Sequence, residues 1–257
     1  MAAVSPQRRV MPPHLDAGCA LFLDVDGTLL DFAPTPDEVA LPEGALPVIT
    51  RLSELLGGAL ALVSGRPLHE LDRVFAPLQL PAAGLHGQEL RGAPAMAAAA
   101  PSQAMQTLRA AAVRLAQQHP GVVIEDKGGN IALHWRKAPE AGAHVTALAQ
   151  AHIGQLAGYR LQPGDHVVEV VPANVDKGRA VQALMRQAPF AGRRPVFVGD
   201  DLTDEYGFTA ANALGGWSVL VGQRTNSHAI YHLPDTGAVH DWLRRNTEPG
   251  PTNTEYA

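Results

Sequence analysis

Short apolar runs alternate with helix-length segments along most of this chain. Four runs rich in Val, Leu and Phe are expected to form strands, at residues 20–25, 59–63, 196–198 and 218–221. Apolar runs separated by helical segments are typical of a parallel sheet with helices on both faces. The pattern therefore predicts an α/β fold with a Rossmann-like core and a parallel sheet.

The pattern changes between residue 92 and about residue 172. The stretch 92–100 is of low complexity and is interpreted as a linker. Helices are expected after it at 102–118 and 140–156, and strands at 122–125, 130–135 and 166–171. These elements predict a smaller α+β domain inserted into the core.

The core pattern resumes after the insert. Helices are expected at 177–187 and 203–212, with a strand at 195–198 between them and a short closing segment from Pro234. We therefore expect a core domain of residues 18–91 and 173–246 and an inserted domain of residues 92–172. Disordered tails are expected at 1–17 and 247–257.

Composition narrows the classes of function. The 257 residues carry a formal net charge of -5 and no long Lys/Arg block, so neither nucleic acid nor a membrane surface is an expected partner. Cys19 is the only cysteine, which excludes an intramolecular disulfide and fits a reducing compartment. No apolar run approaches the roughly 20 residues needed to span a bilayer. We expect a cytoplasmic monomer.

Two carboxylates two residues apart follow the first expected strand, at Asp24 and Asp26. Strand alternation would aim both side chains the same way. Acids placed so closely repel each other unless a cation joins them, and hard oxygen ligands suit Mg²⁺. The alternative is a solvated turn, because Asp-Gly is a common pair in turns. The segment alone does not separate these two interpretations.

A second acidic cluster, Asp200, Asp201 and Asp204, follows the expected strand at 195–198. Acids are also favoured at the start of a helix, so capping is an alternative explanation. Both explanations can hold together, because Thr203 or Asp201 can cap the helix while Asp200 faces a metal. Ligands in open α/β sheets bind beyond the carboxyl ends of the strands, where both acidic loops are expected.

Two further segments supply groups that suit a phosphate. Ser64, Gly65 and Arg66 end another expected strand, where a hydroxyl and backbone N–H groups can hold phosphate oxygens. Lys177 opens a helix, a position where the helix dipole does not favour a cation. An exposed surface lysine is the alternative. The position becomes sensible if an anionic phosphoryl group and carboxylates share the site.

Four segments follow one another along the chain: Asp24 with Asp26, then Ser64, then Lys177, then Asp200 with Asp201 and Asp204. In this order they resemble the motifs of the haloacid dehalogenase superfamily of phosphotransferases. The resemblance implies that Asp24 is the nucleophile, Asp26 the general acid and base, Ser64 a phosphate ligand and Lys177 the charge stabiliser. It further implies that Mg²⁺ is held by Asp24, the backbone carbonyl of Asp26 and Asp200, supported by Asp201 and Asp204. Val25, Thr28, Gly65 and Arg66 are expected to complete the contacts to substrate.

The resemblance extends to one family in that superfamily. Segments 24–30, 36–37, 61–66, 84–87, 131–136 and 196–205 look like trehalose-6-phosphate phosphatase. The resemblance implies that the insert is a cap closing over the sugar of trehalose 6-phosphate. Glu125, Lys127 and Glu169 match the sugar contacts of that cap, where carboxylates accept from hydroxyls and Lys donates. Ordinary strand-surface charge is the alternative.

His86, His134 and Arg136 are further candidates to line the cleft, with a structural role as the alternative for each. Rival functions are another sugar phosphatase of the superfamily, acting on sucrose phosphate or a mannosyl-phosphoglycerate, and a catalytically dead sugar-phosphate sensor. The intact set of Asp24, Asp26, Ser64, Lys177 and Asp200 argues against the sensor.

Overall fold

The computed structural model describes residues 11–31, 39–94 and 102–248. The chain divides into two compact units, one of residues 1–95 with 176–257 and the other of residues 96–175. Most of the expected linker at 92–100, the pair Pro36-Asp37 and parts of both expected tails lie outside the described residues.

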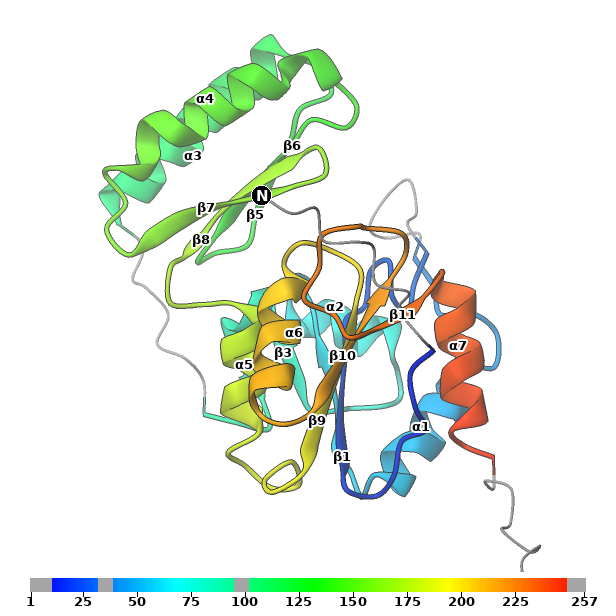
Figure 1. The fold of residues 1–257 in the computed structure, drawn as a ribbon. Coiled ribbons are helices and arrows are strands. Elements are labelled where there is room, and N and C mark those ends of the chain that lie inside the picture. Colours follow the sequence, from blue (N-terminus) through cyan, green and yellow to red (C-terminus); the bar gives the residue numbers. More distant parts are fainter. Residues whose placement is uncertain (1–10, 32–38, 95–101, 249–257) are drawn as a thin grey trace, which may run out of the picture. The chain divides into compact units, whose positions relative to one another are not determined.

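The first unit is built on a seven-stranded sheet with the strand order β11-β10-β9-β1-β2-β3-β4 (Figure 1). Its strands are β1 (Cys19–Leu23), β2 (Leu60–Val63), β3 (Ala82–Gly84), β4 (Glu89–Arg91), β9 (Arg194–Gly199), β10 (Trp217–Val221) and β11 (Tyr231–Leu233). All neighbouring pairs are parallel except β3 with β4. The predicted α/β class with a parallel sheet is confirmed.

Helices cover both faces of this sheet (Figure 1). They are α1 (Ala45–Leu55), α2 (Leu68–Val74), α5 (Lys177–Leu184), α6 (Asp204–Ala213) and α7 (Thr236–Arg245). Helices α5 and α6 pack against each other, and so do α1 and α7. Because helices lie on both sides, every residue of β1, β2 and β10 is buried. This explains why those strands read as continuous apolar runs.

Two aromatic pairs contribute to the core of the first unit, and their strand members Phe22 and Phe197 are direct partners on neighbouring strands. Phe22 of β1 stacks on Phe190 with ring centroids 5.4 Å apart. Phe197 of β9 meets Phe208 of α6 edge to face at 5.8 Å. Such pairs add about 0.5–1.5 kcal/mol each beyond the burial of their area. These ring contacts help to hold β1 and β9, the two strands that carry the acidic loops, in place in the core.

The second unit has a four-stranded antiparallel sheet with the order β5-β6-β8-β7. Its strands are β5 (Val123–Asp126), β6 (Ile131–His134), β7 (Tyr159–Gly164) and β8 (Val167–Pro172), with helices α3 (Gln103–Gln118) and α4 (Gly142–Ile153). A separate apolar cluster includes Leu108, Leu133 and Val145, from both helices and the sheet. The predicted α+β insert is confirmed.

The segment 11–17, which sequence analysis assigned to a disordered tail, lies beside α7. The backbone N–H of Leu15 donates to Asn246 Oδ1 at 2.7 Å, and Trp242 Nε1 donates to the carbonyl of Pro13 at 3.2 Å. These two hydrogen bonds join the start of the described chain to the C-terminal helix. Residues 1–10 of the same expected tail are outside the description.

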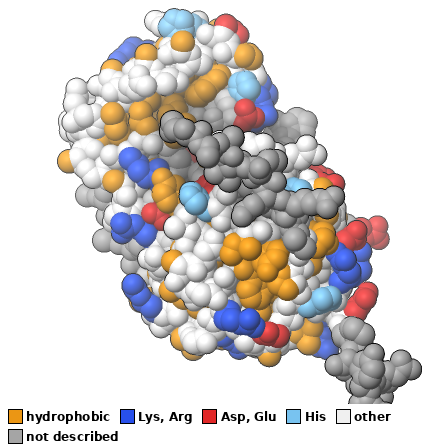
Figure 2. All heavy atoms as spheres, viewed as in Figure 1, with side chains coloured by type: hydrophobic (Ala, Val, Ile, Leu, Met, Phe, Trp, Pro, Cys, Tyr) orange, Lys and Arg blue, Asp and Glu red, His pale blue; other side chains and the backbone are white. Residues whose placement is uncertain are grey.

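On the face drawn in Figure 2, Lys and Arg side chains stand dispersed among other types. In the described ranges no helix combines the length and the apolar character that crossing a bilayer demands.

Candidate active site

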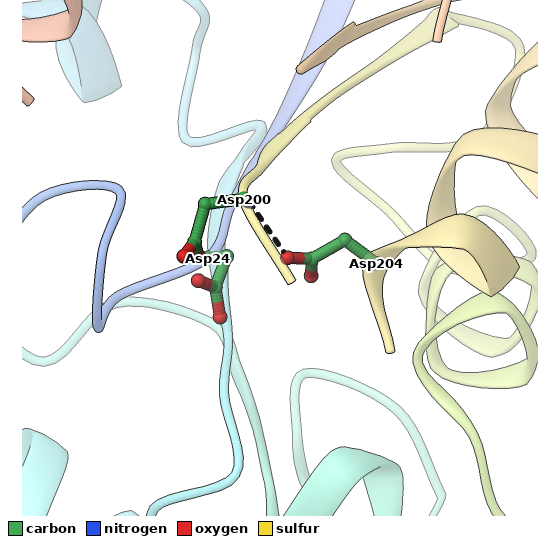
Figure 3. Close-up of side chains that lie close together, drawn as sticks. All are labelled: Asp24, Asp200 and Asp204. Carbon is green, nitrogen blue, oxygen red and sulfur yellow. Dashed lines mark hydrogen bonds between the residues drawn. The ribbon is translucent and has the colours of Figure 1, made fainter. Parts of the chain in front are cut away.

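Asp24 and Asp200 come together at one edge of the sheet. Asp24 follows β1 and Asp200 follows β9, and these strands are parallel neighbours with Leu23 opposite Val198. The N–H of Asp24 donates to the carbonyl of Val198 at 2.9 Å, and this hydrogen bond keeps the ends of the two strands side by side. Carboxylate oxygens of Asp24, Asp200 and Asp204 all lie within 4.8 Å of one another (Figure 3). One divalent cation can therefore reach all three.

Lys177 joins two of these carboxylates. Its Nζ donates to Asp24 Oδ1 at 2.7 Å and to Asp204 Oδ1 at 2.6 Å. The ammonium is the first residue of α5, where the helix dipole opposes a cation, and it is only 3% exposed. The two carboxylates compensate for both costs, and the burial of Lys177 excludes the alternative of an exposed surface lysine.

The pKa values of this cluster are shifted strongly. Burial raises the pKa of Asp24 well above its usual range, and the nearby Asp204 carboxylate adds to the rise, whereas Lys177 opposes it. Burial and Asp204 also raise the pKa of Asp200 to about 7. Burial alone would lower the pKa of Lys177, but Asp204 and Asp24 raise it instead. The protein supplies too little positive charge here for all the carboxylates to ionise.

Charge and space both fit a divalent cation. Hard carboxylate oxygens are the ligands that Mg²⁺ prefers, and the missing positive charge is what a bound Mg²⁺ supplies. Gly27 has φ of +80°, and a Cβ there would lie 2.2 Å from Asp200 Oδ2. The glycine after Asp26 thus both permits the turn and lets the first acidic loop approach the second.

Asp204 also organises the acidic turn that follows β9. Its Oδ2 accepts the N–H groups of Asp200 and Asp201, each at 2.9 Å, while its Oδ1 accepts from Lys177. Asp201 Oδ2 accepts from the hydroxyl of Thr203 at 3.4 Å. Asp204 therefore shapes the loop as well as bringing a carboxylate close to Asp24.

The first acidic loop has its own supports. Thr28 Oγ1 donates to Asp24 Oδ2 at 3.2 Å and lies 3.5 Å from Asp200 Oδ1. The side chain of Val25 is fully buried, and its carbonyl accepts the N–H groups of Leu29 and Leu30 at 2.8 and 2.9 Å. Any contact of Val25 with substrate can thus come only from its backbone N–H.

Asp26 is held by a residue that sequence analysis placed among the substrate contacts. Arg66 donates from Nε and Nη2 to the two oxygens of Asp26, both at 2.8 Å, and from Nη1 to Glu70 at 3.0 Å. The N–H of Arg66 donates to Ser64 Oγ at 3.1 Å. The segment 64–66 thus links the serine hydroxyl to the second carboxylate. In the sequence, the spacing of four residues between Arg66 and Glu70 is the only indication that these two side chains form an ion pair.

The residues Leu85–Gly87 brace the same loop from the other side. The N–H of His86 donates to the carbonyl of Ser64 at 2.8 Å, and that of Leu85 to the carbonyl of Arg66 at 2.9 Å. The imidazole of His86 packs so closely on Gly65 that a Cβ there would lie 2.9 Å from the ring. His86 is 7% exposed and has φ of 58°, a left-handed backbone that is uncommon for residues other than glycine.

In the second unit, the three expected sugar contacts lie together on the sheet. Lys127 Nζ donates to Glu169 Oε1 at 3.0 Å and lies 3.4 Å from Glu125 Oε2. His134 Nε2 lies 3.1 Å from the same oxygen of Glu125. Burial opposes the charge of Lys127, but Glu169 and Glu125 raise its pKa.

Sequence analysis missed two members of this cluster. Gln162 of β7 donates from Nε2 to Glu169 Oε2 at 3.1 Å, and Arg160 donates to Gln162 Oε1 at 2.9 Å. Gln162 is 5% exposed. No pattern identified the strand that carries both residues. Arg136, by contrast, pairs with the exposed Asp165 at 2.8 Å and is 63% exposed itself.

The fold and the acidic site together define a class of protein. A mainly parallel sheet with an Asp-x-Asp loop after β1, acids after the neighbouring β9, a buried lysine and an α+β insert characterises phosphatases of the haloacid dehalogenase superfamily. The model of the trehalose-phosphatase family matches residues 22–235. The chain belongs to this family of phosphoric monoester hydrolases.

Curated relatives agree over most of their length. The chain is 43% identical over 223 residues to a probable trehalose-phosphate phosphatase of Sinorhizobium fredii, covering 86% of this chain and 84% of the relative. It is 40% identical over 237 residues to the trehalose-6-phosphate phosphatase of Escherichia coli, covering 91% and 89%.

Solved structures share the fold at lower identity. The C-terminal domain of the trehalose-6-phosphate phosphatase of C. albicans has a TM-score of 0.79 at 20% identity, covering 89% of this chain and 92% of that one. A sucrose-phosphatase from Synechocystis, solved with sucrose and phosphate, has a TM-score of 0.53 at 16% identity, covering 90% and 98%. At these identities the likeness concerns the fold alone.

Proposed function

We propose that this chain hydrolyses trehalose 6-phosphate to trehalose and phosphate through a phosphorylated Asp24. The observation that carries the proposal is the buried pair of Asp24 and Lys177 beside Asp200, in a chain of the trehalose-phosphatase family. Spontaneous hydrolysis of phosphate monoesters is extremely slow, so nucleophile, acid and charge stabilisation have to act together.

The reaction has two steps. In the first, the Asp24 carboxylate attacks phosphorus in line, the bond to the sugar oxygen breaks, and that oxygen takes a proton from Asp26. In the second, water attacks phosphorus and gives its proton to Asp26, while the bond from phosphorus to Asp24 breaks, which releases phosphate and restores the Asp24 carboxylate. Lys177, 2.7 Å from Asp24, favours the ionised form of the nucleophile and reduces its repulsion from the phosphate dianion.

We propose Mg²⁺ as the cofactor. It would be held by the side chains of Asp24 and Asp200 and by the backbone carbonyl of Asp26, with Asp201 and Asp204 in support. Bound Mg²⁺ supplies positive charge that favours ionised carboxylates and offsets the charge of the transferring phosphoryl group. The carboxylate oxygens within 4.8 Å of one another and the raised pKa values of Asp24 and Asp200 support this assignment.

The remaining assignments divide by unit. In the first unit, Ser64, Gly65, Arg66, Val25 and Thr28 are proposed to surround the phosphate. In the second, Glu125, Lys127 and Glu169 are proposed to bind the sugar hydroxyls. Their mutual contacts support the second assignment, because alternating donors and acceptors suit a polyol. A cytoplasmic location, a monomeric state and the boundaries 18–91 with 173–246 for the core and 92–172 for the cap complete the proposal.

The test is phosphate release from trehalose 6-phosphate, sucrose phosphate and a mannosyl-phosphoglycerate, each with Mg²⁺ or with EDTA. We expect turnover of trehalose 6-phosphate that requires Mg²⁺. Asp24→Asn should lower kcat by about 10³-fold or more, because the amide is not a nucleophile. Asp241→Asn, at an exposed aspartate of α7, is the matched control and should retain full activity.

Three results would contradict the proposal in different ways. A strong preference for sucrose phosphate would reassign the substrate. Binding of trehalose 6-phosphate without turnover would favour a sensor. Wild-type activity in Asp24→Asn would exclude the covalent route.

A further inference from the structure

A guanidinium outside the proposed catalytic set contacts the backbone of the Asp200–Asp201 turn, which follows β9. Arg224 lies in the loop that follows β10. Its Nη2 donates to the carbonyl of Asp201 at 3.0 Å and lies 3.4 Å from the carbonyl of Asp200. No motif in the sequence draws attention to this residue.

The same two residues of the turn are also held on their N–H side. Asp204 Oδ2 accepts the N–H groups of Asp200 and Asp201, each at 2.9 Å. Asp204 thus binds the donors of the turn and Arg224 binds its acceptors. With both kinds of backbone group engaged, rotation of the peptides of residues 200 and 201 would break a hydrogen bond in either direction.

Arg224 is itself anchored. Its Nη1 donates to Glu205 Oε1 at 2.6 Å, and the side chains of Arg224 and Glu205 are only 22% and 18% exposed. Glu205 Oε2 in turn accepts the N–H of His228 at 2.7 Å and lies 3.0 Å from its Nδ1. Glu205 is in the first turn of α6, beside Asp204. The pair of Arg224 and Glu205 therefore connects the loop after β10 to α6, the helix that follows the Asp200–Asp201 turn.

We propose that Arg224, oriented by Glu205, is a positioning residue that fixes the Asp200–Asp201 turn and thereby sets the affinity for the divalent cation. This inference rests on the metal site of the proposed function. Arg224 reaches backbone carbonyls and Glu205, so it acts through the orientation of Asp200. Groups that orient metal ligands typically change metal affinity or activity by about 10- to 100-fold when they are removed.

The experiment measures the dissociation constant for Mg²⁺ of the full-length, EDTA-stripped protein by calorimetric titration, together with its Tm. Arg224→Gln and Glu205→Gln should each raise the dissociation constant about tenfold. The double variant should be no worse than the single ones, because the two residues act as one unit. Arg224→Lys keeps a cation for Glu205 but lacks the planar fork, so its affinity should be intermediate. Arg51→Gln, at an exposed arginine paired with Glu54, is the matched control and should bind as wild type.

A structural role alone would lower Tm while leaving Mg²⁺ affinity within about twofold of wild type, and this result in Arg224→Gln and Arg224→Lys would overturn the inference. Activity of the wild type on trehalose 6-phosphate, assayed in parallel, separates the two levels of failure. An active wild type with unchanged affinity in the variants refutes the inference alone. A wild type that neither binds Mg²⁺ nor turns over refutes the proposed function and the inference together.

Discussion

At the scale of single residues, the site depends on one buried cation among several acids. Lys177 is 3% exposed and touches two carboxylates, whereas Asp204 is fully buried. A buried charge that loses its partner is costly, since the remaining ion keeps its desolvation penalty without the compensating attraction. Lys177 therefore contributes to folding as well as to the proposed reaction.

Lys177→Met should destabilise the metal-free protein by about 3–5 kcal/mol near neutral pH, because it leaves Asp24 and Asp204 buried without a cation. The loss should shrink in mild acid, where the two carboxyls take up protons. Urea unfolding at both pH values measures it. Lys137→Met, at an exposed lysine, is the control, and an equal loss there would contradict the explanation.

Stability should respond to Mg²⁺ in a pH-dependent way. The pKa of Asp200 is raised from 3.8 to about 7, so its protonated form stabilises the metal-free fold fully below about pH 4 and this contribution is lost as pH rises through about 7. Bound Mg²⁺ requires ionised carboxylates, so the gain in Tm from Mg²⁺ should be small near about pH 5 and large near about pH 8.

Differential scanning calorimetry with Mg²⁺ and with EDTA gives this gain in Tm at each pH. Comparing the two conditions cancels groups elsewhere, such as Asp165, whose pKa is lowered. Asp200→Asn should reduce the pH dependence and leave the part that comes from Asp24, whose pKa is also raised. A gain that is the same in acid and in base would show that the raised pKa plays no part in metal binding.

At the scale of elements, the edge strand β7 contributes more than its sequence indicates. It runs Tyr159–Gly164, contains Pro163, and lies at the end of its sheet, where a missing N–H is tolerated. Gln162 on this strand donates to one oxygen of Glu169 while Lys127 donates to the other. The two donors hold the glutamate in one orientation.

Gln162→Leu should raise KM for trehalose 6-phosphate about tenfold and leave kcat unchanged, because one hydrogen bond of about 1.4 kcal/mol that orients Glu169 is lost. An aryl phosphate, which lacks the sugar, should be hydrolysed as by the wild type. Steady-state kinetics on both substrates test this, with the exposed Gln155→Leu as control. Equal losses on both substrates would exclude a role in sugar binding.

Element boundaries also show where sequence analysis reached its limit. The expected strand at 20–25 ends at Leu23, because the carbonyl of Val25 accepts hydrogen bonds from the turn at Leu29 and Leu30. β3, β4 and β11 were not predicted, since each has three residues and so short a strand shows no period. The long buried strands were recognised because continuous apolar runs are a strong signal.

At the scale of the whole molecule, two hydrophobic cores serve two units. The first is centred on the parallel sheet, and the second on Leu108, Leu133 and Val145. All the carboxylates proposed for the metal belong to the first unit, and the expected sugar contacts belong to the second. Damage to one core should therefore leave the chemistry of the other unit intact.

Leu133→Ala, at a side chain 1% exposed in β6, should cost about 2–5 kcal/mol of unfolding free energy in the second unit. Mg²⁺ affinity should stay as in the wild type, since none of the proposed metal ligands is among the described members of this core. Calorimetry should show a transition of the second unit that shifts by itself. The equally buried Leu62→Ala in β2, one strand from Asp24, is the counterpart and should shift the other transition. Weaker Mg²⁺ binding in Leu133→Ala would show that the units are coupled.

The sequence by itself determined the α/β class, the insert and the meeting of Asp24 with Asp200. Apolar runs mark buried strands, loops beyond the carboxyl ends of parallel strands can converge on one crevice, and the resemblance to the haloacid dehalogenase superfamily assigned Asp24 and Asp200 to one metal. That their strands β1 and β9 are neighbours was decided by the tertiary structure. The tertiary structure alone decided which groups pair: Asp26 with Arg66, Glu169 with Gln162, and Arg224 with the turn after β9. The spacing of residues along the chain indicates the type of secondary structure and the direction in which side chains point. Hydrogen bonds between segments far apart in the sequence depend on the paths of the loops, which only the packed chain defines.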